Sequence, residues 1–542
     1  MADFCSAVDT ADYIVAGAGS AGCVIASRLS EDPAVNVILI EAGNSGPRAL
    51  VAMPAGMRYL IGHRTADWNF VAEADPTING ARRPWSRGRL LGGSSAINGM
   101  IYIRGDRRDY DAWAQAGCHG WSFNELQPYF IRSEGFEGTP PGQSHGTFGP
   151  MSVSRQPSPH PLTRNFIAGC AELGIPEIND YCGGEQEGAF IPLTNQRRGR
   201  RSNAAEAFLK PARGRRNLRI MTDCEVDRLV IGNGRATGLK LKRNDGATFE
   251  IAARREVILS AGTIGSPAIL MRSGIGPAAH LATHGITAVL DRAGVGQNLQ
   301  EHAVVSDARE VNVPTFNTMA RQPRLTWEVL QYVLRRRGLL TSPAVSAMAN
   351  VRTLPEFEMP DITLHLAPIV MTPPNRPGDS PGLYPRPATR IVSSICQPRS
   401  RGEIRLAGPK VEDRPIIDHR LLSDPWDVAC LVRGLQLVQR LYATQAFSEV
   451  ITGPLETVPP PGEEPEQLEE FVRQWTSIGF HPVGTCRMGS DDAAVVDPQL
   501  RVNGIAGLRV ADASIMPTLI SANTNAAAMM IGEKAADLIR AT

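Results

Sequence analysis

The glycine pattern near the start of the chain is the feature most directly tied to chemistry. Gly17, Gly19 and Gly22 form G-x-G-x-x-G between an apolar run and residues with helical spacing. Such glycines allow a tight turn, the approach of a pyrophosphate to a helix N-terminus, and close helix–strand packing. Glu41 follows the apolar run 35–40, about 20 residues later, where an acid can bind a ribose 2′-hydroxyl. The pattern predicts a dinucleotide site and favours FAD or NAD over NADP, whose 2′-phosphate a carboxylate would repel.

Two glycine-rich segments later in the chain could also contact a phosphate. Residues 88–105 contain Gly-Gly-Ser-Ser at 92–95, whose bare N–H groups and hydroxyls can bind an anion, although an ordinary loop would have the same composition. Residues 262–276 contain Ser266-Pro267, which is typical of a helix start, and Gly274, which is typical of a helix stop. On physical grounds alone, the second segment predicts only a short helix.

One histidine and two asparagines stand out in the last part of the chain. His481 opens a Gly-containing segment that ends at residue 489. Asn523 and Asn525 precede an Ala- and Met-rich helical pattern that runs to Ile539. A histidine suits removal of a proton from an alcohol, because its ordinary pKa is near neutral. The alternatives are a structural loop histidine and two helix-capping asparagines.

Together, the four segments resemble the glucose-methanol-choline (GMC) family of FAD-dependent oxidoreductases, from about residue 12 to residue 540. The residue sequences of these segments are similar to those of bacterial alcohol and choline-type dehydrogenases and of hydroxymethylfurfural-type oxidases. The resemblance implies FAD extended across a Rossmann-like domain, with its isoalloxazine ring at the interface with a substrate domain. His481 matches the family's catalytic histidine, and Asn525 is matched to the second member of its catalytic pair.

The resemblance also implies a set of FAD contacts, with Asp512 and Ala513 near the ribityl and pyrophosphate groups and Val226 and Ala261 near the adenine. The complete set is Gly17, Ala18, Gly19, Ser20, Ala21, Gly22, Glu41, Ala42, Trp68, Leu91, Gly92, Gly93, Ser94, Asn98, Gly99, Met100, Ile101, Val226, Ala261, Asp512, Ala513, Asn523 and Thr524. Some family members attach FAD through a histidine after the Gly-Gly-Ser motif. Residues 95–98 contain no histidine, so non-covalent FAD is expected, and no metal site is expected.

The expected reaction is oxidation of a primary alcohol to an aldehyde, with electrons passed to O₂ or to a quinone or dye acceptor. His481 would remove the hydroxyl proton, and hydride transfer to flavin N5 is chemistry that the cofactor supplies. The amide of Asn525 would donate to the developing alkoxide. The helix dipole behind it would stabilise the reduced flavin by roughly 0.5 to 2 kcal/mol. A lyase or photodecarboxylase on the same fold remains an alternative, as does a flavoprotein with a binding role. The absence of an obvious acidic cage disfavours choline.

The bulk composition narrows the class of protein. The chain has 542 residues, 42% hydrophobic residues and a net charge of +1, which is typical of a globular protein with at least two domains and gives no sign of nucleic-acid binding. The nine widely spaced cysteines argue against a disulfide framework. The chain shows neither a signal-peptide pattern nor an apolar run of the ~20 residues that a membrane helix needs. A cytoplasmic protein is expected, with peripheral membrane contact left open.

The surrounding elements predict an α/β (α+β) protein that combines a Rossmann-like FAD-binding domain with a substrate domain built on an antiparallel sheet flanked by helices. The predicted FAD-binding domain comprises 1–155, 200–305 and 478–542, and the predicted substrate domain comprises 156–199 and 306–477. Residues 142–146 match G-x-S-x-G, but the prolines around them predict a loop and no nucleophile elbow. Further expected elements are strands at 218–221, 226–231, 236–242, 248–252, 256–260, 361–370 and 389–396, and helices at 324–337 and 425–442.

Overall fold

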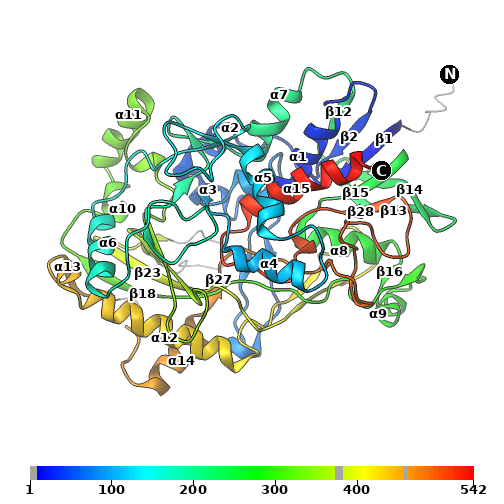
Figure 1. The fold of residues 1–542 in the computed structure, drawn as a ribbon. Coiled ribbons are helices and arrows are strands. Elements are labelled where there is room, and N and C mark those ends of the chain that lie inside the picture. The colour runs from blue at the N-terminus through cyan, green and yellow to red at the C-terminus, as the bar shows by residue number, and fades with distance from the viewer. Residues whose placement is uncertain (1–8, 373–381, 457–459) are drawn as a thin grey trace.

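The computed structural model describes residues 9–372, 382–456 and 460–542, and two seven-stranded sheets organise them (Figure 1). The first sheet has the order β12 (Leu218–Met221), β2 (Val37–Ile40), β1 (Asp9–Ala16), β15 (Thr248–Leu259), β14 (Arg235–Arg243) and β13 (Cys224–Gly232), with β28 (Leu508–Val510) paired to β15. Its β12, β2, β1, β15 and β28 run parallel, whereas β13, β14 and β15 form an antiparallel meander. The strands predicted at 248–252 and 256–260 are therefore one strand.

Two helices from opposite ends of the chain pack together beside the parallel strands. They are α1 (Ser20–Leu29) and α15 (Asn525–Arg540). A Cβ at Gly532 would lie 2.8 Å from the carbonyl oxygen of Ala21, so the glycine permits this close approach. Arg28 of α1 forms an ion pair of 2.8 Å with the buried Glu533 of α15. The red C-terminal helix therefore lies beside the blue βαβ unit in Figure 1.

The second sheet is antiparallel throughout. Its order is β26 (Ile451–Pro454), β18 (Ala303–Val311), β23 (Ala388–Ile395), β20 (Ile362–Ala367), β19 (Ala347–Val351) and β8 (Gly188–Phe190), with β27 (Ser477–Ile478) paired to β18. The helix α12 (Pro425–Tyr442) packs on one face of this sheet. Because strand side chains alternate between faces, the residues on the opposite face are free to line a cavity.

The predicted boundary between residues 305 and 306 falls inside β18, which lies wholly in the second sheet. The division of the chain into domains remains a prediction. The helices expected at 324–337 and 425–442 are α11 (Arg324–Arg335) and α12. No helix in the described parts of the chain is long and apolar enough to cross a membrane.

The helix of the second glycine-rich segment differs from the expectation. α8 (Gly262–Arg272) begins four residues before Ser266, and Pro267 lies inside it. The Ser266 hydroxyl accepts a hydrogen bond from the Ala261 N–H (3.1 Å) and donates one to Asp512 (2.6 Å). Ser266 therefore links two loops and does not start the helix. The helix stops where expected, at Gly274, which has φ = +83°.

Candidate active site

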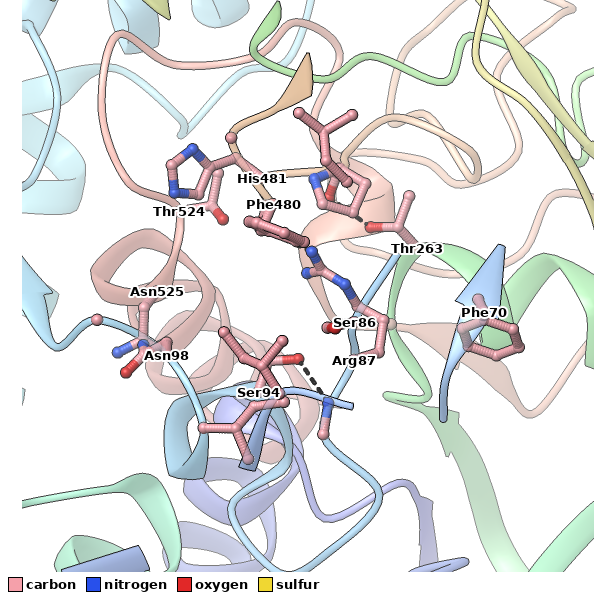
Figure 2. A pocket seen from close by; sticks show the side chains of 18 of the residues that line it. Phe70, Ser86, Arg87, Ser94, Asn98, Thr263, Phe480, His481, Thr524 and Asn525 are labelled. Carbon is pink, nitrogen blue, oxygen red and sulfur yellow. Dashed lines mark hydrogen bonds between the residues drawn. The ribbon is translucent and has the colours of Figure 1, made fainter. Parts of the chain in front are cut away.

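A large cavity of about 870 Å³ is lined by residues of both sheets, and Figure 2 shows part of its wall. Most of the predicted FAD contacts line it: Gly17, Gly19, Ser20, Ala21, Glu41, Ala42, Trp68, Gly93, Ser94, Asn98, Gly99, Met100, Ile101, Val226, Ala261, Asp512, Ala513, Asn523 and Thr524. His481 and Asn525 line it too. The other predicted contacts, Ala18, Gly22, Leu91 and Gly92, are not among the lining residues.

The glycine loop after β1 is shaped by backbone contacts. Gly17 has φ = +104°, and a Cβ there would lie 2.5 Å from the Ser260 carbonyl oxygen. A Cβ at Gly22 would lie only 1.9 Å from the Gly17 oxygen, so the helix can pack here only without a side chain. Gly19 is the N-cap of α1 and has open space around it. The N-terminus of α1 can thus receive a pyrophosphate against bare backbone.

Glu41 closes this end of the cavity. Its carboxylate accepts hydrogen bonds of 3.0 Å from the N–H groups of Ala18 and Gly43. Burial raises the pKa of Glu41 to about 7. The side chain lines the cavity and keeps acceptor capacity for a ribose hydroxyl. Ala18 is absent from the wall because its N–H is turned toward this carboxylate.

The Gly-Gly-Ser segment packs directly on the glycine loop. A Cβ at Gly93 would lie 2.7 Å from the Cα of Gly19, and the Gly92 N–H donates to the Ala18 carbonyl at 2.8 Å. The Ser94 hydroxyl accepts from the Gly88 N–H at 3.2 Å, which Figure 2 shows as a dashed line. The glycine loop of residues 17–22 and the Gly-Gly-Ser segment therefore form one backbone surface, which fits an extended dinucleotide.

His481 lies on the substrate side of the cavity, and its hydrogen bonds fix its tautomer. His302 Nε2 lies 3.1 Å from the carbonyl oxygens of both Cys396 and Ile520, so this nitrogen carries a proton. The neutral His302 then has its lone pair on Nδ1, which lies 2.9 Å from His481 Nδ1. His481 Nδ1 must donate this bond. Its lone pair is consequently on Nε2, where Asn523 Nδ2 donates at 2.8 Å.

The hydrogen-bond partner of His481 is Asn523 and not Asn525, and the catalytic role expected for Asn525 stays a prediction. Asn525 Oδ1 instead accepts a 2.7 Å hydrogen bond from the Ser20 hydroxyl. In Figure 2, Asn525 lies near Asn98, away from the His481 ring. Asn525 is the first residue of α15, whereas Asn523 precedes the helix, and this difference sends the two side chains in different directions.

The electrostatics of the site keep His481 neutral. Burial, followed by the neighbouring His302, His365 and Arg87, holds the pKa of His481 well below its usual value. Burial also lowers the pKa of His302 to about 4. At neutral pH, both rings are therefore uncharged, as the tautomer assignment requires. The His481 Nε2 lone pair accepts from the Asn523 amide here, and a substrate hydroxyl would have to replace this donor before His481 could take its proton.

Backbone contacts fix the position of the two histidines. The buried Glu301 carboxylate accepts from the N–H groups of His481 (2.7 Å) and His302 (2.9 Å). Burial raises the pKa of Glu301 to about 8. Phe480 has φ = +66°, an unfavourable conformation for a side-chain-bearing residue, and its carbonyl accepts from Arg87 at 2.7 Å. This strained turn directs His481 into the cavity.

His302, Glu301, Arg87 and His365 are site residues that the sequence reasoning missed. His302 stands in a Gln-Glu-His run before an apolar strand, and no spacing rule links it to a residue 179 positions later. The rarity of histidine, with ten in the chain, is the only signal that could have drawn attention to it.

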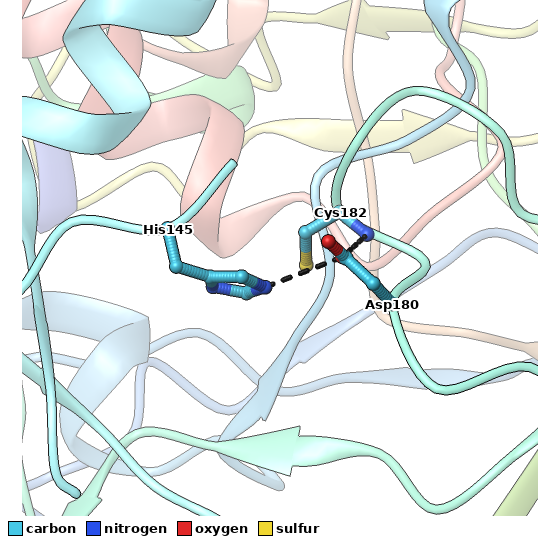
Figure 3. A group of neighbouring side chains, drawn as sticks. All are labelled: His145, Asp180 and Cys182. Atoms are coloured by element: carbon cyan, nitrogen blue, oxygen red, sulfur yellow. Dashed lines mark hydrogen bonds and ion pairs between the residues drawn. The ribbon is translucent and has the colours of Figure 1, made fainter. Parts of the chain in front are cut away.

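A second polar cluster lies outside the cavity (Figure 3). His145, Asp180 and Cys182 place their ligand atoms within 4.8 Å of one another. However, His145 Nδ1 lies 2.7 Å from Glu134 and Nε2 lies 3.3 Å from Asp180. Burial opposes protonation of the ring, but these two carboxylates raise the pKa of His145. Both ring nitrogens of His145 therefore have carboxylate partners, and the cluster forms a hydrogen-bonded network.

The same cluster explains the G-x-S-x-G sequence. Ser144 lies in a loop between β6 (Glu134–Phe136) and β7 (Met151–Val153), and no helix follows it. Its carbonyl accepts from the buried Arg104 at 2.7 Å. The segment is a loop that this hydrogen-bonded network holds in place.

Family models for GMC oxidoreductase match residues 11–304 and 398–532. The chain therefore belongs to the GMC oxidoreductase family of FAD-dependent enzymes, and it is an oxidoreductase that acts on CH–OH donors.

Individual relatives agree with this assignment. The chain is 39% identical over 540 residues to an uncharacterized GMC-type oxidoreductase of Mycobacterium tuberculosis, covering 98% of this chain and 99% of that protein. It is 37% identical over 537 residues to an oxygen-dependent choline dehydrogenase of Sinorhizobium medicae, covering 98% and 95%.

Solved structures of oxidases share the fold. Pyridoxine 4-oxidase from Mesorbium loti has a TM-score of 0.87 and 32% identity, covering 98% of this chain and 99% of that one. A formate oxidase has a TM-score of 0.90 and 25% identity, covering 98% of both chains. These relatives act on different substrates, so membership of the family by itself leaves the substrate open.

Proposed function

We propose that this enzyme oxidises a primary alcohol to the aldehyde, with His481 as the base. The observation that carries the proposal is a relay of hydrogen bonds. Two backbone carbonyls bind His302 Nε2, and His302 Nδ1 binds His481 Nδ1, which leaves the lone pair of His481 on Nε2. A neutral imidazole fixed in this tautomer can take the hydroxyl proton. A structural histidine would not need such a constraint.

Asn523 is the second polar group at the reacting position. Its amide donates toward His481 Nε2, which is where an alcohol oxygen would have to bind. The substrate hydroxyl would donate to His481 while its oxygen accepts from Asn523. As the proton leaves, this amide would stabilise the negative charge that develops on the oxygen. The bound FAD would supply the hydride acceptor.

We also propose that FAD is bound without a covalent bond. Among the described residues that line the cavity, the only histidines are His365 and His481, and both lie on the substrate side. The wall around Gly93 and Ser94 consists of backbone and hydroxyl groups, which bind by hydrogen bonding. Acid precipitation should release all the flavin into the supernatant, and a yellow protein pellet would contradict the proposal.

Anaerobic mixing of the holoenzyme with aliphatic, benzylic, furanic and sugar alcohols tests the reaction. Bleaching of the flavin by a primary alcohol is the expected result, with one aldehyde formed per flavin reduced. Subsequent addition of O₂ or of a quinone then identifies the electron acceptor. A flavin that no alcohol bleaches, but that releases a product without net reduction, would instead indicate a lyase or photodecarboxylase.

A further inference from the structure

An arginine that has no hydrogen-bond or ion-pair partner among the described residues lines the cavity. Arg390 is on β23, and its neighbours on the sheet are Ala308 of β18 and Ala367 of β20. All three line the cavity. No described residue forms a hydrogen bond or ion pair with the Arg390 side chain, and its Nε is buried and unsatisfied. The two alanines are too small to cover the guanidinium.

The sheet register places this arginine close to the reacting position. His365 and Ser306 pair with Val392, one side-chain repeat along β23 from Arg390. Two residues along a strand correspond to about 7 Å. His365 is one of the groups that lower the pKa of His481, so Arg390 lies one side-chain repeat along the sheet from a neighbour of His481.

No described carboxylate on this part of the wall balances the charge. Glu41, Glu225 and Asp512 line the cavity too, but they lie at its nucleotide end. Asp307 also contributes to the lining, but it neighbours Ala308 on β18, where side chains alternate between faces, and its carboxylate accepts from Arg309 at 2.6 Å. Burial lowers the pKa of Arg390, which reflects the absence of a compensating acid. A guanidinium remains charged in proteins even so.

We propose that Arg390 binds an anionic group at the far end of the substrate, so that the preferred alcohols carry a carboxylate or a phosphate. This inference rests on the proposed alcohol oxidation and names its substrate class. A planar guanidinium binds both anions through paired hydrogen bonds. Val304, Val392 and Ile369 supply an apolar wall for the carbon skeleton between the two groups. The same charge would repel a quaternary ammonium group.

The test compares para-substituted benzyl alcohols of similar shape on the holoenzyme. The probes are 4-(hydroxymethyl)benzoate, 4-(hydroxymethyl)phenyl phosphate, benzyl alcohol and a 4-(trimethylammoniomethyl) analogue. We expect kcat/KM for at least one anion to exceed that for benzyl alcohol by about tenfold or more, which is the range for a charge-assisted hydrogen bond. The better of the two anions identifies the group. The cation should be the poorest substrate.

Arg390→Gln should reduce the ratio of kcat/KM for the anion to kcat/KM for benzyl alcohol to near one, mainly by raising KM for the anion. Arg390→Lys should restore part of the preference. The matched control is Arg386→Gln, which removes a charge from the same chain segment but at a half-exposed side chain paired with Glu310 and Glu456. A preference that survives Arg390→Gln, or that is absent from the wild type, overturns the inference.

A binding measurement separates this inference from the proposed function. Benzoate should perturb the flavin absorbance of the wild-type enzyme but not of Arg390→Gln. If no alcohol reduces the flavin, the proposed oxidation fails, and this binding difference still decides the role of Arg390. If benzyl alcohol reduces the flavin but benzoate binds equally to both proteins, only the anion site fails.

A second, independent observation concerns α11, which lies at the upper left edge of Figure 1. Its outward face is apolar: Trp327 is 57% exposed, Leu334 is 70% exposed, and Val329, Leu330 and Val333 are exposed too. Arginines surround this face at positions 321, 324, 335, 336 and 337. The one acid on the helix, Glu328, is buried and accepts from the Leu339 N–H.

We infer that α11 binds in the interface of an anionic membrane. An apolar stripe with Trp and Leu, bordered by basic residues, is the composition of a helix that lies in a lipid interface. The positive charge favours acidic lipid headgroups over a second copy of the same basic helix. From α11 the chain passes through η5 (Leu339–Thr341) into Pro343, which lines the cavity. Membrane binding would thus occur close to the substrate side.

Vesicle sedimentation of the holoenzyme tests this surface. We expect the enzyme to bind vesicles of phosphatidylcholine that contain roughly 30% phosphatidylglycerol, because such an anionic surface attracts polybasic segments. Binding to pure phosphatidylcholine should be weak, and high salt should release the enzyme from the anionic vesicles. Trp327→Ser/Leu334→Ser should abolish binding, whereas Phe148→Ser, at a fully exposed residue elsewhere, should not. Absence of binding to the anionic vesicles overturns the inference. So does a dimer in sedimentation velocity that the double variant dissociates.

Discussion

The two ends of the cavity differ in whether backbone atoms or side chains form their walls. The nucleotide end is mainly backbone: the glycine loop of residues 17–22, the Gly-Gly-Ser segment and the N-terminus of α1 meet there, and Glu41 adds one carboxylate. The substrate end is a network of side chains, in which His481, His302 and Asn523 come from three separate segments. The comparison shows that the proposed cofactor site depends on glycines, which leave room beside the backbone, whereas the proposed catalysis depends on which nitrogen of His481 carries a proton.

Replacing His481 with Ala should have the largest effect of a single substitution. Turnover should fall by roughly two to four orders of magnitude, the range for loss of a general base, while flavin remains bound. The measurement is single-turnover flavin reduction, with flavin content taken from the absorbance of the same sample. A loss of only about tenfold would remove His481 from the role of base.

The next largest effect should distinguish the two asparagines. Asn523→Ala should reduce the rate of flavin reduction by about a hundredfold, because it removes a donor to developing negative charge. Asn525→Ala is the matched control, since it removes an identical side chain two residues away that contacts Ser20. We expect it to affect flavin binding more than the rate. Equal rate losses in both variants would contradict the assignment of Asn523.

His302→Phe should cost about tenfold in rate, because the relay that fixes the His481 tautomer is lost while the ring volume is kept. The pH profile provides a readout that a purely structural defect would not change. The base must be neutral to act, so activity is lost as pH falls through the pKa of His481, which lies well below 6.5. Because His302 is one of the groups that lower this pKa, the acid limb should move to higher pH in the variant. An acid limb that does not move would exclude the relay.

The smallest effect should appear at the nucleotide end. Glu41→Gln keeps the shape of the side chain but weakens its hydrogen bonds to the Ala18 and Gly43 N–H groups. We expect the flavin dissociation constant to rise by several-fold, roughly the value of one charged hydrogen bond, with kcat unchanged for the flavin-loaded enzyme. Apoenzyme titration with FAD measures the first quantity. A change in kcat would mean that the two ends are not independent.

The sequence by itself determined the nucleotide end. G-x-G-x-x-G between two strands, with Glu41 at the end of the second strand, specifies a local βαβ unit, and most of the residues predicted from it line the cavity. Local patterns also located α11, α12 and most strands. They could not reveal that residues 248–259 form one strand or that α8 begins at Gly262, because element ends depend on neighbouring segments.

Only the tertiary structure decided the catalytic arrangement. Asn523 and Asn525 are the same residue type two positions apart, and the start of α15 determines which of them reaches His481. His302 and Glu301, which directly precede β18, contact His481 only because the fold brings the two segments together, and β23 places Arg390 on the cavity wall. Local backbone conformation depends on residues that are near one another in the sequence, so the sequence pattern predicts it. A hydrogen-bond relay needs side chains from distant parts of the chain, and only the fold brings these within hydrogen-bonding distance.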